Sequence, residues 1–304
     1  MSTETNPYIV SSDIEGLFDS WSQKTGYVSP SYDFFNGARN DLENVLGGYF
    51  PEQVEIVHED ELRSGLISLA KNCTVPIISL DRAYVDQHTP NIVGFLDVTR
   101  MVDENFNDIG LKPRPGYPPI DVQLDSFRLG KTSPVALLDD VVFTGDGITS
   151  LAKQLAERGR PVVKLISGIG ITEGMQLLRM GGVDAQCVKE YEAVIDEICQ
   201  RDFVAGAPMS GRTLLDAQGR FWSAPYFNPF GDPIKWASIP EAASDDFSDF
   251  CLEQSIAIWR KIEQLSCANV PVKAIPRLIR GMSENPSISR ELVNFKRNNS
   301  SSEI

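Results

Sequence analysis

Two adjacent carboxylic acids, Asp139 and Asp140, come directly after the apolar run 135–138. The pair Thr144-Gly145 begins four residues after Asp140, and an amphipathic helix pattern begins just after this pair. Carboxylates in such a place bind sugar hydroxyls or hold a hard cation such as Mg²⁺ through oxygen. A glycine-bearing loop at a helix N-terminus offers free backbone N–H groups to an anion. The two features together predict a site for a phosphorylated sugar that carries a diphosphate.

The expected anion loop consists of Thr144, Gly145, Asp146 and Gly147, and the hydroxyl of Thr149 is a further candidate donor. Asp146 places a carboxylate inside this loop. It would repel an anion unless its side chain turns away or caps the helix.

Strand and helix patterns alternate along the middle of the chain. Short apolar runs at 73–80, 91–99, 134–138, 161–169 and 184–194 predict strands, and helical patterns separate most of them, at 62–72, 148–159 and 173–182. This alternation predicts an α/β fold with a mostly parallel sheet flanked by helices. In such a sheet ligands bind beyond the carboxyl ends of the strands, where Asp139 and Asp140 are expected.

We expect three regions: an N-terminal helical or loop extension over 1–60, an α/β core over 61–200, and a C-terminal hood or helical extension over 201–304. The C-terminal region differs in composition from the core, because glycine, proline and aromatic residues dominate 201–236. Its aromatic cluster is expected to be a packing or dimer surface. The segment 104–133, with four prolines inside 112–119, has no periodicity and predicts a long functional loop.

The run LLDDVVFTGDGIT, residues 137–149, resembles the phosphoribosyl-pyrophosphate motif of type I phosphoribosyltransferases. The resemblance implies that Asp139 and Asp140 hold the ribose hydroxyls and Mg²⁺, and that residues 144–147 cradle the 5-phosphate. Gly147 stands where a second threonine is expected, with Thr149 two positions later. Phe143 stands where oxopurine-specific members carry an acid, so that specificity is disfavoured.

The same resemblance implies roles for residues outside the motif. After the first core strand a short loop would bind pyrophosphate, here through Ser79, Asp81 and Arg82. Arg100, after the next strand, is another candidate for the same role. The segment 104–133 would be a mobile catalytic loop whose Lys112 and Arg114 stabilise the departing pyrophosphate. Phe203 follows the last core strand and is the candidate for stacking on a base. The alternative role of Phe203 is that of a buried residue in the hydrophobic core.

Composition narrows the function classes further. The formal net charge of −14 argues against a broad nucleic-acid surface. The five cysteines are widely spaced and odd in number, which indicates reduced thiols. With only two histidines, a multi-histidine metal centre is disfavoured. No apolar run approaches the roughly 18 residues of a membrane span, and no N-terminal signal pattern is present. We therefore expect a cytoplasmic protein without membrane or nucleic-acid partners.

The expected activity is transfer of a 5-phosphoribosyl group from phosphoribosyl pyrophosphate to a small nitrogenous acceptor, with Mg²⁺ as cofactor. The resemblance also implies a homodimer. The acceptor and any general base stay open. Three alternatives remain: a non-catalytic sensor of phosphoribosyl pyrophosphate or nucleotide, an NAD-type oxidoreductase using the glycines of 168–174, and a protein-binding α/β scaffold. A P-loop nucleotidase is disfavoured because no GxxxxGK[ST] motif occurs.

Overall fold

A five-stranded parallel sheet organises the middle of the chain in the computed structural model, which describes residues 6–130 and 132–300. Its strand order is β4-β3-β7-β8-β9, and every neighbouring pair is parallel. The strands are β3 (Ile77–Ser79), β4 (Ile92–Phe95), β7 (Val135–Val142), β8 (Val162–Ile171) and β9 (Asp184–Tyr191). The predicted fold class, a mostly parallel α/β sheet flanked by helices, is confirmed.

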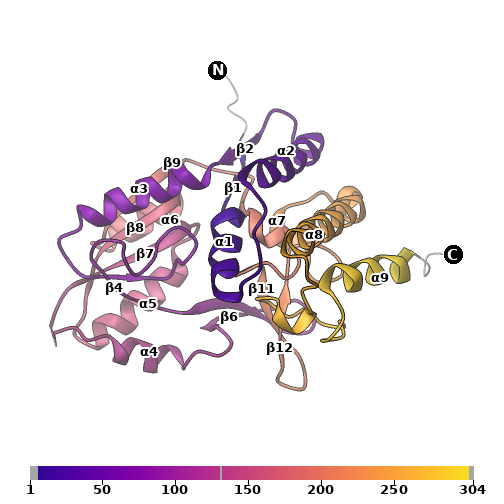
Figure 1. The fold of residues 1–304 in the computed structure, drawn as a ribbon. Helices are drawn as coiled ribbons and strands as arrows, with labels where there is room; N and C mark the ends of the chain where they lie inside the picture. Colours follow the sequence, from indigo (N-terminus) through magenta and orange to yellow (C-terminus); the bar gives the residue numbers. More distant parts are fainter. Residues whose placement is uncertain (1–5, 131, 301–304) are drawn as a thin grey trace. The chain divides into compact units, whose positions relative to one another are not determined.

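Helices cover both faces of this sheet (Figure 1). On one face α3 (Glu59–Lys71) packs against β8 and β9, and it comes so close that a Cβ on Gly65 would lie 2.5 Å from the Val188 side chain. On the other face the helices are α4 (Ile120–Ser126), α5 (Asp146–Glu157) and α6 (Thr172–Met180). These helices share one apolar core with the sheet.

Helix α5 forms where its pattern predicts. Its apolar stripe, Ile148, Leu151 and Leu155, is buried, as expected for residues at helical spacing. The helix ends at Glu157, and Gly159 just beyond it adopts φ +73°, a conformation that glycine enters without steric cost. The strand before α5 fixes where the helix N-terminus points, and this positions the loop between them.

The structure corrects two expectations. Strand β7 does not stop before the acidic pair but continues through it to Val142, so Asp139 and Asp140 are strand residues. The segment 104–133 is not one long loop: it contains strand β6 (Asp108–Pro113) and helix α4. These elements were not predicted because proline, which occurs four times in 112–119, is disfavoured inside both helices and strands.

The chain divides into two compact units. The first, called here the sheet unit, comprises Val57–Arg100 and Gly110–Val194. The second, called here the terminal unit, comprises 6–56, 101–109 and 195–300 within the described residues. Most residues of the expected N- and C-terminal extensions belong to the terminal unit, together with 101–109 from within the expected core.

Two further sheets have the strand orders β10-β1-β2 and β12-β11-β5-β6. Besides β6, their strands are β1 (Tyr8–Ser11), β2 (Val54–Val57), β5 (Val98–Val102), β10 (Asp196–Cys199), β11 (Arg212–Leu215) and β12 (Phe221–Ala224). The last two residues of β5, Met101 and Val102, belong to the terminal unit, and they pair there with β11.

The helices of this unit are α1 (Ile14–Thr25), α2 (Tyr32–Tyr49), α7 (Pro233–Ala237), α8 (Ser244–Ser266) and α9 (Ile288–Ser300), with the short 3₁₀ turns η1 (Gln200–Phe203), η2 (Glu241–Ala243) and η3 (Val272–Ala274).

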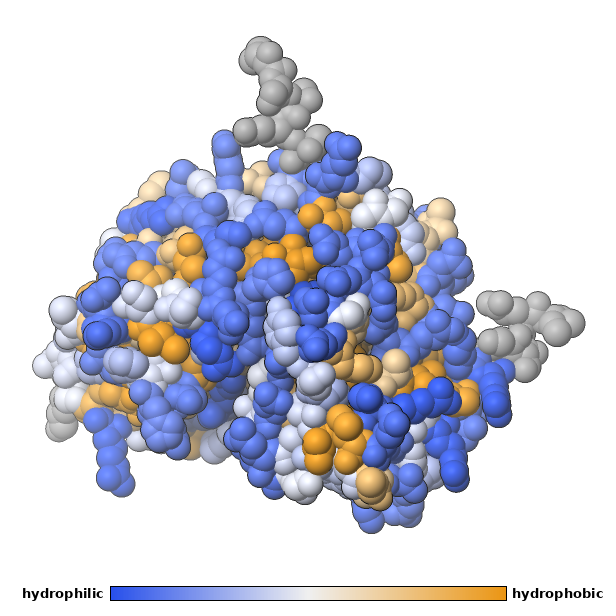
Figure 2. Space-filling view, turned by 45° about the horizontal axis from the view of Figure 1, so that its top comes forward, coloured by the Kyte–Doolittle hydropathy of each residue, from blue (hydrophilic) through white to orange (hydrophobic). Residues whose placement is uncertain are grey.

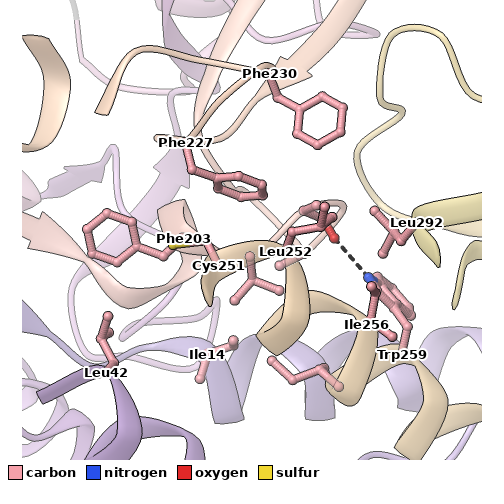
Figure 3. Close-up of a cluster of buried hydrophobic side chains, with 14 of the residues drawn as sticks. Ile14, Leu42, Phe203, Phe227, Phe230, Cys251, Leu252, Ile256, Trp259 and Leu292 are labelled. Carbon is pink, nitrogen blue, oxygen red and sulfur yellow. Dashed lines mark hydrogen bonds between the residues drawn. The ribbon is translucent and has the colours of Figure 1, made fainter. Parts of the chain in front are cut away.

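Aromatic side chains build the core of the terminal unit (Figure 3). Trp259 of α8 is fully buried, packs edge-on against Phe18, and donates a 2.8 Å hydrogen bond from Nε1 to the Ala205 carbonyl. Phe227 and Phe230 belong to the same core, so these two members of the C-terminal aromatic cluster have a packing role.

Hydrophilic residues predominate on the face drawn in Figure 2, and hydrophobic residues lie among them in small groups. None of the described helices combines the length and apolar composition that crossing a bilayer requires.

Candidate functional site

The acidic pair lies near the carboxyl end of the central strand of the sheet unit. Asp139 is in register with Ser167 on β8, and the preceding residue, Leu138, is in register with Ser79 on β3. Both aspartates are half-buried. The Asp140 N–H donates to Asp139 Oδ1 at 3.1 Å, and the Val141 N–H donates to Asp140 Oδ1 at 2.9 Å. Backbone donors therefore orient both carboxyls at the sheet edge where ligands of parallel sheets bind.

The pKa of Asp139 is raised well above its usual value. Burial is the largest cause, because it disfavours the charged form. The negative charge of Asp140, a side-chain hydrogen bond with that residue and the charge of Asp81 raise the pKa further. The three acids therefore lie near one another, and Asp139 retains a proton to a higher pH than an exposed aspartate. A bound cation would relieve this repulsion.

The loop after β3 is held by its own acid. Asp81 is buried, and its carboxylate accepts hydrogen bonds from the N–H groups of Ala83 at 2.8 Å, Tyr84 at 2.9 Å and Val85 at 3.2 Å. The Ser79 hydroxyl donates to the Asp81 carbonyl at 2.8 Å. Ser79 and Asp81 thus fix the loop's shape, a role that their residue types alone did not distinguish from ligand binding.

Arg82 is paired within the protein. Its Nε and one terminal nitrogen donate to the two carboxylate oxygens of Asp97 at 2.7 and 2.8 Å, and its guanidinium lies 4.1 Å from the centroid of the Phe95 ring. Asp97 is 6% exposed, whereas the Arg82 side chain is 39% exposed. The pairing holds the guanidinium in a fixed orientation with one side open to solvent. Sequence reasoning missed Asp97, although an acid at the end of the run 91–97 was a usable signal.

The loop between β7 and α5 has an internal hydrogen-bond pattern. The Thr144 hydroxyl donates to Asp146 Oδ2 at 2.8 Å, so the acid neither turns away from the loop nor caps the helix. The Thr149 hydroxyl donates to the Gly145 carbonyl at 2.9 Å, which directs it toward the helix backbone. Gly147 has open space around it. Thr144, Asp146 and Gly147 are exposed, and the backbone N–H groups of the first turn of α5 lack partners within the helix, as at any helix N-terminus.

Two glycines bring the loop against α6. Gly145 adopts φ +80°, and a Cβ there would lie 3.2 Å from the Gly174 carbonyl oxygen. A Cβ on Gly174 would lie only 2.3 Å from the Phe143 carbonyl oxygen. The loop backbone and the first turn of α6 are therefore in direct contact, and only glycine fits between them.

The two candidate cations of the 104–133 segment have different environments. Lys112 lies on β6 with an exposed side chain. Arg114 is anchored: its N–H donates to the Asp97 carbonyl at 2.9 Å, and its side chain donates to the Val98 carbonyl at 3.0 Å. Arg100 is exposed on β5.

Phe203 belongs to the terminal unit. It is 2% exposed and packs edge-on against Phe247, with ring centroids 5.0 Å apart. The structure does not bring it together with the acidic pair in one unit. Its packing is that of a core phenylalanine, which was the alternative prediction for this residue.

The glycines of 168–174 do not form a dinucleotide-binding turn. Gly168 and Gly170 lie inside strand β8, and Gly174 lies inside α6. A Cβ on Gly168 would lie 2.8 Å from the Asp140 carbonyl oxygen, so this glycine serves close packing beside the acidic pair. The geometry does not support the oxidoreductase alternative, which needs these glycines in a strand-to-helix loop.

No protein-family model and no curated protein matches the sequence. Solved structures overlap with part of the chain. The UMP synthase of Leishmania donovani has 14% identity and a TM-score of 0.32 over 45% of this chain and 28% of its own. The orotate phosphoribosyltransferase of Aeropyrum pernix has 17% identity and a TM-score of 0.26 over 42% of this chain and 69% of its own. The adenine phosphoribosyltransferase of Giardia lamblia, complexed with 9-deazaadenine, has 14% identity and a TM-score of 0.32 over 44% of this chain and 80% of its own. Each of these matches spans less than half of the present chain.

Proposed function

We propose that the chain transfers a 5-phosphoribosyl group from phosphoribosyl pyrophosphate to a small nitrogenous acceptor. One observation carries the proposal: the half-buried pair Asp139-Asp140 lies on the central parallel strand, and the N-terminus of α5 follows it within a few residues. A sugar held by the carboxylates would have its 5-phosphate near the loop at 144–147. The resemblance of residues 137–149 to the phosphoribosyl-pyrophosphate motif supports the same assignment.

The donor set fits Mg²⁺. Asp139 and Asp140 offer hard carboxylate oxygens, and burial together with mutual repulsion makes this pair a place where positive charge is favoured. Within the described residues no group of three or more His, Cys, Asp or Glu side chains is arranged to hold a metal ion. Mg²⁺ suits such a site because it usually takes one or two carboxylates and completes its shell with substrate phosphates and water. Bound there, it would neutralise the charge of the diphosphate.

The chain's own residues have defined parts in this reaction. The C1–O bond to pyrophosphate breaks with its electron pair on the leaving group, and the acceptor nitrogen supplies the pair for the new bond to C1. Asp139 and Asp140 orient the ribose by accepting from its hydroxyls, and their negative charge offsets positive charge on the ring. The backbone N–H groups at the start of α5 hold the phosphate. Arg82, whose guanidinium is held by Asp97 and is partly exposed, would bind the diphosphate.

The experiment is an assay of pyrophosphate release from phosphoribosyl pyrophosphate and Mg²⁺ with a panel of purine bases, pyrimidine bases and simple amines. Release that depends on both Mg²⁺ and one acceptor supports transfer. The homodimer remains a prediction, which light scattering of the same sample checks.

A binding protein without turnover is the second candidate, because one observation favours it. The Thr144 hydroxyl is donated to Asp146, which also adds negative charge beside the expected phosphate. Magnesium-dependent binding of phosphoribosyl pyrophosphate without release on any acceptor would favour this sensor role over the enzyme.

Lys112 and Arg114 give a prediction for the enzyme. Lys112→Ala should lower turnover by roughly tenfold or more with unchanged melting temperature, because its exposed side chain has no packing role to lose. Arg114→Ala should lower both turnover and the melting temperature, because the Arg114 side chain also anchors the segment to the Val98 carbonyl. Steady-state kinetics and thermal unfolding check this, with the exposed Lys71→Ala as the matched control. Equal turnover of all three variants and the parent would remove this segment from the mechanism.

A further inference from the structure

Asp97, which follows strand β4, contacts three other segments of the sheet unit. Its buried carboxylate accepts two hydrogen bonds, of 2.7 and 2.8 Å, from Arg82 in the loop after β3. Its carbonyl oxygen accepts from the backbone N–H of Arg114, just beyond β6, at 2.9 Å. Its own N–H donates to the side-chain oxygen of Gln123, on α4, at 2.8 Å. One residue therefore joins the loop after β3, the end of β6 and helix α4.

Gln123 completes this junction. Its side chain is buried, and its amide nitrogen donates to the Asp97 carbonyl at 3.2 Å and to the Pro118 carbonyl at 2.7 Å. The amide thus uses both its oxygen and its nitrogen on backbone groups, and it holds Asp97 through the N–H and the carbonyl together. The stretch from Arg114 to Gln123 is consequently fastened to Asp97 at both of its ends.

The junction fixes two arginines on neighbouring residues of the chain. Arg82 is held by the Asp97 carboxylate, and the Arg114 side chain donates to the carbonyl of the next residue, Val98, at 3.0 Å. The two arginines come from separate segments, and two guanidinium charges against one carboxylate leave an excess of positive charge. Such an excess, in a chain whose net charge is −14, favours an anion at this place.

The Asp97 carboxylate needs an explanation beside an anion, because its own charge repels one. The explanation lies in the geometry of Arg82. A bidentate pair with Asp97 and the face of the Phe95 ring, 4.1 Å from the guanidinium carbon, hold the guanidinium in one orientation. An arginine that is already fixed loses less rotamer freedom when it binds a ligand than a free one does. Orientation then outweighs the repulsion.

We propose that Asp97 and Gln123 are positioning residues. Asp97 orients Arg82, and Gln123 fixes both Asp97 and the stretch that begins at Arg114, so that the two arginines act together on one diphosphate. Neither Asp97 nor Gln123 contacts the diphosphate. The proposal rests on the proposed function, in which Arg82 and Arg114 bind that group.

The sign of one effect tests the role of Asp97. Asp97→Asn removes the negative charge and one of the two acceptors that hold Arg82. If the carboxylate acted through its charge alone, its loss would strengthen the binding of an anion, whereas a positioning role predicts weaker binding. We expect titration of the full chain with pyrophosphate and Mg²⁺ to show about tenfold lower affinity in Asp97→Asn.

Glu190→Gln is the matched control for this substitution. Glu190 accepts hydrogen bonds of 2.8 and 2.7 Å from Arg179, in a bidentate pair of the same kind within the same unit. Its loss should leave the affinity for pyrophosphate at the parent value. A ligand-free readout accompanies the titration: phenylglyoxal, mapped by mass spectrometry, should modify Arg82 faster in Asp97→Asn than in the parent.

A double-mutant cycle shows whether Asp97 acts through Arg82. Arg82→Gln should weaken pyrophosphate binding at least as much as Asp97→Asn does, and adding Asp97→Asn to it should cause no further loss. Gln123→Met keeps the side-chain length but removes the amide, and it should weaken binding about fivefold. Circular dichroism checks that each variant is folded, and Gln123→Met carries the test if Asp97→Asn is not.

The outcomes separate this inference from the proposed function. Equal or tighter pyrophosphate binding by Asp97→Asn, a further loss when it is added to Arg82→Gln, or parent affinity in Gln123→Met would overturn the inference and leave the proposed transfer standing. A parent protein that binds neither pyrophosphate nor phosphoribosyl pyrophosphate with Mg²⁺ would refute the proposed function, and the inference with it.

Discussion

Asp139→Asn is expected to make the protein more stable and nearly inactive. The asparagine cannot ionise, so the substitution removes a charge that burial, Asp140 and Asp81 all disfavour. We expect the melting temperature at pH 8 to rise by roughly 2–5 °C. Turnover should fall by roughly a hundredfold, because the carboxylate's contribution to sugar and cation binding is lost.

The pH dependence of this gain follows from the direction of the pKa shift. Folding raises the pKa of Asp139, so the stability linked to its proton is fully present below the unfolded-state pKa, near 4, and is lost as the pH rises through the higher folded-state value. The Asn variant lacks this loss. Its advantage over the parent should be smallest near pH 4 and largest at alkaline pH.

Thermal unfolding from pH 4 to pH 9 measures this difference. Asp19→Asn, at an exposed position of α1, is the control and should match the parent throughout. An Asp139→Asn protein that is less stable than the parent at pH 8 would show that the acidic pair is not under repulsion.

The second large effect is expected at the contact between the loop and α6. Gly174→Ala would place a Cβ 2.3 Å from the Phe143 carbonyl oxygen and 2.9 Å from the Thr144 carbonyl carbon. Both atoms belong to the backbone, so neither moves aside as a flexible side chain would. We expect the free energy of unfolding to fall by about 2–3 kcal/mol. Affinity for phosphoribosyl pyrophosphate should also fall, because the anion loop is displaced.

Chemical denaturation of Gly174→Ala measures this cost against a matched glycine in another helix. A Cβ on Gly47 of α2 meets nothing within 4 Å, so Gly47→Ala should gain about 0.5–1 kcal/mol from helix propensity alone. If both alanine variants were equally stable, the tight contact between loop and helix would not exist in solution.

The elements that carry local signals were predictable. The stripe Ile148, Leu151 and Leu155 predicted α5, and the alternation of apolar runs with helical patterns predicted the parallel sheet. The apolar run 135–138 predicted the strand that leads to the acidic pair, but not its continuation through the pair to Val142 or its central place in the sheet. Such predictions succeed because hydrophobic periodicity shows which face of a helix or strand is buried. This pattern can be recognised from residues that are close together in the sequence.

Contacts between distant parts of the chain were not predictable in this way. Nothing in the run 77–85 shows that Arg82 pairs with Asp97, and nothing near Thr144 shows that Gly174 packs on that loop. The union of the two ends of the chain in one unit depends on β1 pairing with β10, across almost two hundred positions of sequence. Each of these depends on tertiary geometry, to which a single sequence gives only an indirect signal.

The central claim is that Asp139 and Asp140 bind a pentose whose phosphate lies on the following loop. Isothermal titration of the chain with phosphoribosyl pyrophosphate, with and without Mg²⁺, tests it most directly. The account predicts one site per chain, loss of binding without Mg²⁺, and affinity at least about tenfold weaker in Asp140→Asn. No heat of binding with Mg²⁺ present, or equal affinity in the parent and Asp140→Asn, would contradict it.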